Sequence, residues 1–217
     1  MSSKPDARDD NDDRGYLFII AAPSGAGKTS LVNALLERDP RLVLSISHTT
    51  RAARPGEIDG QHYHFVTPSE FEQMVDAGEF MEQARVFDHC YGTNRKSVAH
   101  QLEQGRDVVL EIDWQGARQV HSVFPHCCHI FIIPPSLEIL RDRLTARGQD
   151  SARVIERRMK DAQAEISHWA EFDQLVVNDD FNMALEELLA IINDHRIDKP
   201  HQVNKDYQHL AQRLGKS

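Results

Sequence analysis

An apolar run followed at once by a glycine-rich loop constrains this chain more than any other feature. Residues 16–21 form a short apolar stretch rich in β-forming residues, and the loop after it contains Gly25 and Gly27. From Lys28 to Arg38, apolar residues recur at three- and four-residue spacing, which is typical of a helix. A strand, a glycine loop and a helix in this order predict a phosphate-binding loop, because backbone N–H groups and the helix N-terminus then converge on one anion.

Within this loop, the chemistry favours a nucleoside triphosphate with a magnesium ion. Lys28 can neutralise the β- and γ-phosphates, and the Thr29 hydroxyl can ligate Mg²⁺. An ordinary glycine-rich turn with an exposed lysine is the alternative, and the flanking strand and helix argue against it. Alanine, at position 22, stands where the usual pattern begins with glycine, but the rest of the pattern is intact. We therefore assign ATP binding to the whole segment, which consists of Ala22, Pro23, Ser24, Gly25, Ala26, Gly27, Lys28 and Thr29.

The rest of the chain alternates apolar runs with helical patterns. Strands are expected at 107–112, 129–133 and 175–177, and helices at 115–123, 137–146, 152–171 and 181–197. This order predicts an α/β fold, a P-loop NTPase-type parallel sheet flanked by helices. Between residues 42 and 105, short alternating segments broken by glycines predict an inserted, partly antiparallel lobe.

Composition narrows the class of protein further. The chain is 40% hydrophobic and 27% charged, as in ordinary globular proteins, and no apolar stretch approaches the roughly 18 residues of a membrane span. Residues 1–14 are acidic and lack an apolar core, so we expect a disordered tail, no signal peptide and a cytoplasmic protein. The net charge of −9 argues against nucleic acid as a partner.

A second cluster of chemistry-bearing residues runs from Ser47 to Tyr63. Arg51 and Arg54 lie three residues apart in a segment rich in hydroxyl groups. Because a planar guanidinium binds phosphate through paired hydrogen bonds, the two arginines predict a site for a second phosphate, on an acceptor molecule. Two solvated surface arginines would be the alternative for an isolated Arg-x-x-Arg.

Taken together, these segments strongly resemble guanylate kinases, in order from about residue 16 to residue 196. The resemblance rests on the phosphate loop, the run 47–63, Glu82, Tyr91-Gly92-Thr93, Glu111-Ile112-Asp113 and Asn178-Asp179-Asp180. It implies transfer of the γ-phosphoryl group of ATP to GMP, with Mg²⁺, in purine nucleotide metabolism. It also implies that the chain can self-associate as a homo-oligomer.

Composition, patterning and the resemblance together divide the chain into three parts. These are a disordered acidic tail (1–14), a guanylate kinase domain (15–198) and a polar C-terminal extension (199–217) that we expect to pack loosely. Within the domain we expect a core (15–41 and 106–198), a GMP-binding lobe (about 42–105) and a helical lid (about 147–159).

Eight positions of this chain match the residues that form the acceptor (GMP) pocket in the family. The chemistry agrees, because a hydroxyl of Ser47 or Thr93 suits the guanine O6 acceptor and the Glu82 carboxylate suits the two neighbouring N–H donors. The arginines and tyrosines would bind the GMP phosphate. The GMP-binding set is Ser47, Arg51, Arg54, Tyr63, Glu82, Tyr91, Thr93 and Asp113.

The resemblance also implies residues for the ATP side of the site. The resemblance implies that Arg147 and Arg158 reach over the triphosphate, with Arg143 beside them, and that Asn178 and Asp179 lie near the adenine of ATP. Phosphoryl transfer depends on positioning and charge neutralisation. Catalytic roles therefore fall to Lys28, Arg51, Arg54, Arg147 and Arg158.

Two alternatives remain open at this point. The first is a non-catalytic guanylate-kinase-like module that binds phosphopeptides through the acceptor pocket; the intact phosphate loop and lid arginines argue against it. The second is a kinase for another nucleoside monophosphate, against which Glu82 and Thr93 argue.

Overall fold

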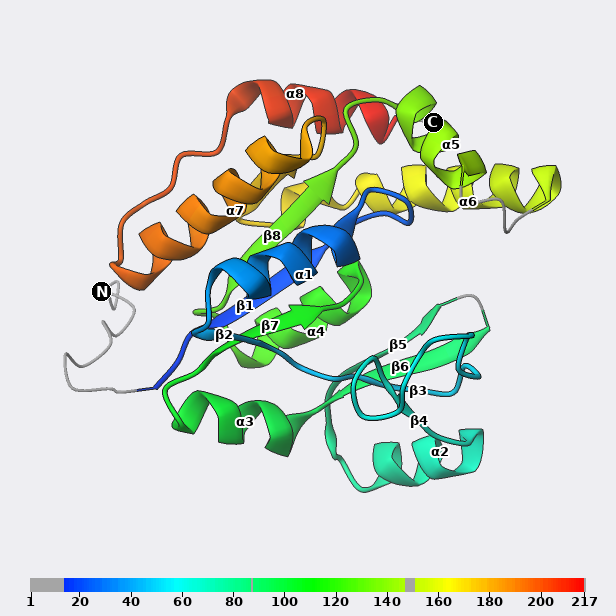
Figure 1. Cartoon of the computed structure of the whole chain (residues 1–217), viewed down its shortest axis with the longest axis vertical. Helices are drawn as coiled ribbons and strands as arrows, with labels where there is room; N and C mark the ends of the chain where they lie inside the picture. The colour runs from blue at the N-terminus through cyan, green and yellow to red at the C-terminus, as the bar shows by residue number, and fades with distance from the viewer. Residues whose placement is uncertain (1–13, 87, 147–150, 217) are drawn as a thin grey trace, which may run out of the picture.

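The computed structural model describes residues 14–86, 88–146 and 151–216. They form an α/β body built on a five-stranded sheet, with a smaller four-stranded sheet beside it (Figure 1). The predicted fold class is confirmed. Arg147, which was expected in the lid, lies outside the described residues.

The main sheet is parallel throughout the described strands. Its order is β2 (Leu42–Leu44), β7 (Asp107–Glu111), β1 (Leu17–Ala21), β8 (Cys128–Ile133) and β9 (Gln174–Val177). The central strand β1 is buried along its whole length, as expected for a parallel strand covered on both faces. Strand β2 was not predicted, and it pairs with β7 although the sequence assigned residues 42–44 to the inserted lobe.

Helices cover both faces of the main sheet. On one face, α1 (Lys28–Arg38) and α7 (Phe181–Arg196) pack against β1 and β8. On the other face, α3 (Arg95–Glu103) and α4 (Trp114–Val123) pack against β1 and β7. The carboxyl ends of the parallel strands therefore form one edge of the body, where ligands of open α/β sheets bind.

The smaller sheet is mixed, which matches the partly antiparallel lobe. Its order is β4 (His64–Phe65), β3 (His48–Thr49), β6 (His89–Asn94) and β5 (Phe80–Val86). β6 pairs antiparallel with β3 and β5, whereas β3 and β4 are parallel. α2 (Pro68–Asp76) begins at a capping box between Thr67 and Glu70, which satisfies amides of its first turn.

The helix that contains the described part of the expected lid packs on the helix before it. α5 (Leu137–Ala146) and α6 (Ala152–Ile166) share an apolar cluster that includes Leu140, Leu144 and Met159. The sequence predicted one helix over 152–171. In the structure α6 ends at Ile166, and a separate 3₁₀ turn, η1 (Trp169–Glu171), follows.

The C-terminal extension is not loosely packed, contrary to the sequence-based expectation. Residues 205–214 form α8 (Lys205–Leu214), in which Ala211 is fully buried and Leu214 is 6% exposed. These side chains join Phe131 of β8 and Ile166 of α6 in one apolar cluster. The expectation was wrong because a polar composition hides a narrow apolar stripe at helical spacing.

We expect Leu214→Ala to lower the free energy of unfolding by about 2 kcal/mol, since it removes buried methyl groups and leaves a cavity. Urea denaturation followed by circular dichroism measures the change. Gln212→Ala, at an exposed position of the same helix, is the control and should change stability by less than about 0.5 kcal/mol. Equal stability of Leu214→Ala and wild type would contradict the packing of α8.

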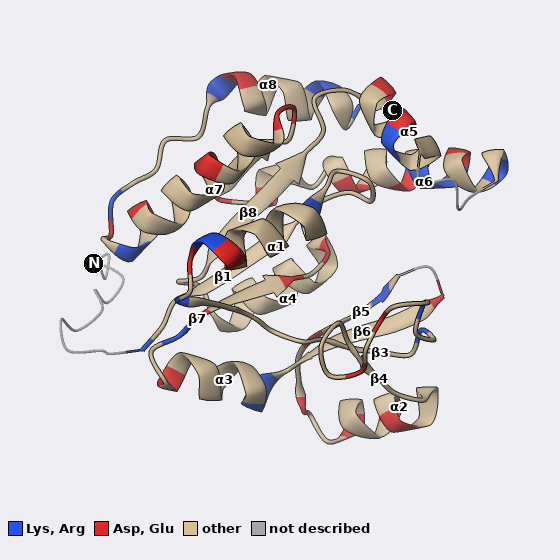
Figure 2. Cartoon of the chain, in the orientation of Figure 1, with Lys and Arg blue, Asp and Glu red and all other residues tan. Residues whose placement is uncertain are grey.

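Charged residues of both signs are interspersed over the helices (Figure 2). α5 and α6 each carry acidic and basic residues. In the ranges that the structure describes, no helix combines the length and the apolar character of a membrane span.

Candidate active site

The predicted phosphate loop joins the central strand to the first helix. β1 ends at Ala21 and α1 begins at Lys28, and between them Gly25 and Gly27 both have φ of +93°. Glycine adopts this left-handed conformation without steric cost. A side chain at Gly27 would also place its Cβ 2.4 Å from the Asn178 amide nitrogen, so the loop requires glycine there for two reasons.

Asn178 holds this loop from the neighbouring end of β9. Its buried side chain donates from Nδ2 to the Ala26 carbonyl at 2.7 Å, and its own carbonyl accepts from Arg143 Nη2 at 2.9 Å. The sequence placed Asn178, Asp179 and Arg143 near the adenine or phosphates of ATP. In this structure Asn178 and Arg143 support the loop, and Asp179 is exposed beyond it.

Lys28 and Thr29 both contact the end of β7. Lys28 Nζ donates to the Ile112 carbonyl at 2.8 Å, and Thr29 Oγ1 donates to Glu111 Oε1 at 2.5 Å. These contacts follow from the pairing of β7 with β1, which brings their carboxyl ends side by side. In the sequence, only its place in a motif marks Glu111; its position at the carboxyl end of a buried strand is the signal that it belongs to this site.

A cavity of about 280 Å³ connects the phosphate loop with the smaller sheet. It brings together most of the loop and five of the predicted GMP-binding residues. The sequence had not identified six further lining residues, which approach from α1, β5, β7 and α6. The five predicted residues are Ser47, Tyr63, Glu82, Tyr91 and Asp113. The additional residues are Ser30, Ala84, Val86, Glu111, Ile112 and Glu165.

Glu82 is the most deeply buried acid of this cavity, at 3% exposure. Thr93 Oγ1 donates to Glu82 Oε1 at 2.6 Å, and Ser47 Oγ lies 3.5 Å from Thr93 Oγ1. Burial raises the pKa of Glu82 to about 7, although the hydrogen bond from Thr93 opposes the shift. The three residues predicted to recognise guanine therefore form one hydrogen-bonded group, with Thr93 buried behind Glu82.

Asp113 occupies the N-cap of α4 beside this group. One of its carboxyl oxygens, Oδ1, accepts from the Gly116 amide at 2.8 Å, which satisfies a free donor of the first helical turn. A Cβ at Gly116 would lie 2.5 Å from Glu82 Oε2. The first turn of α4 therefore needs glycine so that the Glu82 carboxyl can approach.

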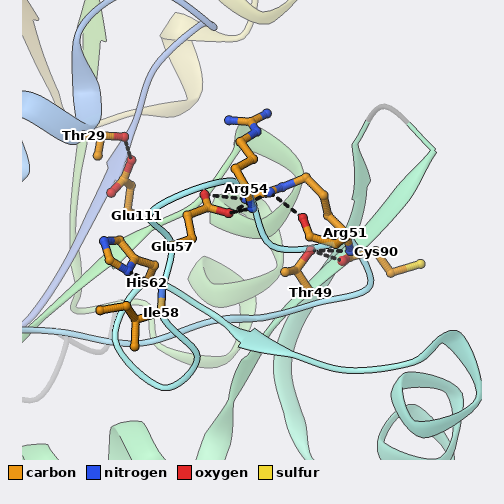
Figure 3. Close-up of polar contacts among 10 residues, drawn as sticks. Thr29, Thr49, Arg51, Arg54, Glu57, Ile58, His62, Cys90 and Glu111 are labelled. Atoms are coloured by element: carbon orange, nitrogen blue, oxygen red, sulfur yellow. Dashed lines mark hydrogen bonds and ion pairs between the residues drawn. The ribbon is translucent and has the colours of Figure 1, made fainter.

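Arg51 is held in a bidentate ion pair within its own loop (Figure 3). Its guanidinium donates to Glu57 Oε1 and Oε2 at 2.8 and 2.9 Å, and Glu57 also accepts from the Arg54 amide at 2.7 Å. The paired guanidinium lowers the pKa of Glu57 to about 2. The side chain of Arg54 is turned away from Glu57 (Figure 3), and neither arginine is among the cavity-lining residues.

Two tyrosines lie between Arg51 and the cavity. The guanidinium carbon of Arg51 is 5.4 Å from the centre of the Tyr63 ring, and the Tyr63 and Tyr91 rings are 5.9 Å apart in an edge arrangement. Burial raises the pKa of Tyr63 to about 12. Its phenol therefore stays protonated at neutral pH and can donate a hydrogen bond.

The remaining predicted arginine, Arg158, lies half-buried on α6. It does not line the cavity in this structure. The structure thus assembles the phosphate loop and the base-recognition residues, and leaves Arg51, Arg54 and Arg158 at or beyond the border of the cavity.

The glycine loop follows the carboxyl end of a central parallel strand, and Lys28 and Thr29 begin the next helix. This arrangement defines a P-loop nucleotide-binding protein. The acidic and hydroxyl-bearing pocket opposite the loop adds a place for a second ligand. The family model for guanylate kinase matches residues 14–195. The chain therefore belongs to the guanylate kinase family, whose activity is ATP:GMP phosphotransfer.

Individual relatives agree with this assignment. A guanylate kinase of Idiomarina loihiensis is 57% identical over 203 residues, which cover 93% of this chain and 97% of the relative. One of Nitrosococcus oceani is 61% identical over 183 residues, covering 84% and 90%. The crystal structure of a guanylate kinase from Anaplasma phagocytophilum superposes with a TM-score of 0.70 at 35% identity, covering 87% of this chain and 88% of that one.

Proposed function

We propose that the phosphate loop binds ATP, that the lobe side of the cavity binds GMP, and that the γ-phosphoryl group passes between them. The observation that carries this assignment is the single cavity, which is lined both by Lys28 and by Ser47, Glu82 and Tyr91. A donor site and an acceptor site in one cavity suit direct, in-line transfer, for which positioning is the main requirement.

In this proposal, Glu82 and its hydroxyl neighbours select guanine. The ionised Glu82 carboxylate accepts from the guanine N1–H and N2–H₂ groups, and the Ser47 hydroxyl donates to O6. The Thr93 hydroxyl, which donates to Glu82 Oε1, holds that carboxylate in place. Adenine would present a donor and an acceptor in the wrong places. Each mispaired buried group costs about 1 to 3 kcal/mol.

The GMP phosphate meets the tyrosines and arginines at the border of the lobe. Tyr63 and Tyr91 donate from their phenols, and Arg51 and Arg54 neutralise charge between the two phosphates. Arg51 is already oriented by Glu57, so little side-chain entropy remains to be lost when it binds a ligand. Arg147 and Arg158 would contribute from the lid. No strong general base is required, because the phosphate acceptor is already ionised at neutral pH.

A magnesium ion fits the residues at the start of α1. The Thr29 hydroxyl and the Glu111 carboxylate meet at 2.5 Å, and both are the oxygen ligands that Mg²⁺ prefers, directly or through water. Thr29 and Glu111 would hold the ion, and when bound it would offset charge on the β- and γ-phosphate oxygens. Lys28 contributes a fixed positive charge at the same place.

GMP affinity should depend on pH through Glu82. The pKa of its carboxyl, about 7 as a result of burial, means that the ligand-free site takes up a proton below neutrality, and the protonated form cannot accept two N–H groups. We expect the KM for GMP to rise as pH falls below about 7, approaching tenfold per pH unit. Steady-state kinetics between pH 5.5 and 8.5 measures the profile.

Glu82→Gln provides the matched test of this profile. The side-chain N–H₂ of the introduced glutamine would face a guanine N–H group, so two hydrogen-bond donors would meet. We therefore expect the KM for GMP to rise about 10- to 100-fold at pH 8, and the pH dependence of KM to disappear. Glu72→Gln, at an exposed position of α2, should behave as wild type. An unchanged pH profile in Glu82→Gln would show that another group causes it.

The function as a whole is tested by supplying ATP and Mg²⁺ with GMP, AMP, CMP, UMP or dTMP and measuring ADP formation. Turnover with GMP alone is the expected result. Turnover only with another nucleotide would overturn the roles of Ser47, Glu82 and Thr93. Absence of turnover with measurable GMP or phosphopeptide binding would favour the non-catalytic module, which the family comparisons do not favour.

A further inference from the structure

The strand that carries Glu82 lies at the edge of the smaller sheet. β5 is the last strand in the order of that sheet, next to β6. A strand in this position leaves backbone N–H and C=O groups without strand partners on its outer side. The register with β6 also shifts between Phe80 and Glu82, and bulges of this kind redirect side chains near functional sites. The direction of Glu82 therefore depends on support from outside the sheet.

Gln119 of α4 supplies this support at the residue after Glu82. Gln119 Oε1 accepts from the Gln83 amide at 3.1 Å, and Gln119 Nε2 donates to the Gln83 carbonyl at 2.7 Å. One side chain thus satisfies both backbone groups of Gln83, as a neighbouring strand would. Nε2 also donates to the Gln115 carbonyl at 3.3 Å, so both N–H groups of the side-chain amide are used. The sequence gave no role to Gln119, and the transfer mechanism described above does not use it.

The same face of α4 meets the Glu82 carboxyl group. Asp113, Gly116 and Gln119 follow each other at three-residue spacing, which places them on one side of the helix. A Cβ at Gly116 would lie 2.5 Å from Glu82 Oε2, and Thr93 Oγ1 donates to Glu82 Oε1 at 2.6 Å. The carboxyl group is therefore held between Thr93 and the first turn of α4, and Gln119 fixes the distance between that helix and β5.

We propose that Gln119 is a positioning residue for guanine recognition: by bonding both backbone groups of Gln83, it fixes the edge of β5 and with it the direction of the Glu82 carboxylate. This inference rests on the proposed function, because it takes guanine as the ligand of Glu82. Gln119 is not among the residues that line the cavity, so it acts on the base only through Glu82.

Inosine monophosphate (IMP) is a suitable probe of this direction. IMP has the same sugar, phosphate, O6 and N1–H as GMP but lacks the 2-amino group. A correctly directed Glu82 carboxylate accepts from N1–H and N2–H₂ of GMP, and from N1–H alone of IMP. The ratio of the two Kd values therefore reports how well Glu82 faces the base, because the phosphate contacts are common to both ligands and cancel.

The test compares wild type with Gln119→Met by calorimetry at pH 8, where Glu82 is mostly ionised because the pKa of its carboxyl is about 7. Methionine fills similar space but offers only a weak thioether acceptor and no donor. We expect the Kd for GMP to rise about tenfold and that for IMP about twofold, so that the preference for GMP falls about fivefold. The Kd for ATP should change less than about twofold, because the phosphate loop is untouched. Gln73→Met, the same change at an exposed position of α2, should retain all wild-type values.

A double-mutant cycle with Glu82→Gln shows whether Gln119 acts through Glu82. In that background, Gln119→Met should change the Kd for GMP by less than about twofold, because coupled residues are not additive. Thermal unfolding identifies variants that do not fold, and Gln119→Ala replaces Gln119→Met if the latter does not.

Three results would overturn the inference. They are an unchanged preference for GMP in the folded Met or Ala variant, equal losses of GMP and IMP affinity, and an equal effect of Gln119→Met with and without Glu82. A wild type that binds GMP and IMP equally well is a different failure. It would remove guanine recognition by Glu82 from the proposed function, and the inference would fall with it.

Discussion

Lys28→Ala should lower kcat/KM for GMP-dependent ADP formation by at least about 10²- to 10³-fold, the typical effect of removing one fixed charge-stabilising donor. Lys28 opens α1 at the end of the phosphate loop, and its ammonium group is held by the Ile112 carbonyl at 2.8 Å. This contact holds the cation at the wall of the cavity. Alanine would leave the charge that develops between the phosphates without its fixed counter-charge.

The measurement is ADP formation at saturating Mg²⁺, with circular dichroism to show that the variant is folded. Lys205→Ala, at an exposed position of α8, removes the same charge far along the chain and should leave turnover unchanged. A loss confined to the KM for GMP would contradict the role of Lys28, because that pattern would place it in the acceptor pocket.

Arg196→Ala should lower the free energy of unfolding by about 3 to 5 kcal/mol, the range seen when one partner of a buried ion pair is removed. The Arg196 side chain is only 6% exposed. It bonds Asp39, which follows α1, and donates from Nε to Asp107 Oδ2, at the start of β7, at 2.7 Å. The variant would leave two carboxylates without their cation where three elements meet.

The effect should depend on pH in a defined direction. Burial alone would raise the pKa of Asp39, but hydrogen bonds from Arg196 and the Arg41 amide hold it below its usual value. A lowered carboxyl pKa stabilises the fold above the pKa of the unfolded chain, about 3.9, and this contribution disappears as pH falls through the lower folded value. The difference between wild type and variant should therefore be largest near neutrality.

Urea denaturation at pH 7 and at pH 3 measures both statements. Arg38→Ala is the matched control, because it removes an arginine from an ion pair with Glu186 whose side chains are 54% and 60% exposed. Exposed pairs of this kind contribute about 0 to 1 kcal/mol. Equal destabilisation by the two variants would mean that the buried network contributes no more than a surface pair.

The features that depend on neighbouring residues could be predicted from the sequence. α1 begins and ends where its periodicity indicated, and the phosphate loop precedes it, because glycine conformation and helical spacing are local properties. The buried strands β1, β7, β8 and β9 were recognisable as apolar runs. The resemblance to guanylate kinases supplied Ser47, Glu82 and Thr93, which the structure brings together from β5, β6 and the residue before β3.

The features that were missed or wrongly assigned depend on contacts between distant segments. β2 has three residues, too few for a pattern, and is defined by its pairing with β7. α8 is ordered because it covers β8 and β9, not because of its own composition. Glu111 and Glu165 join the site only when β7 and α6 are set beside the phosphate loop. Local chemistry in the sequence thus determined the phosphate loop, the main helices and strands, and the family. The tertiary structure decided which charges are buried, paired and directed at the ligands, because burial and pairing depend on residues that are neighbours in space.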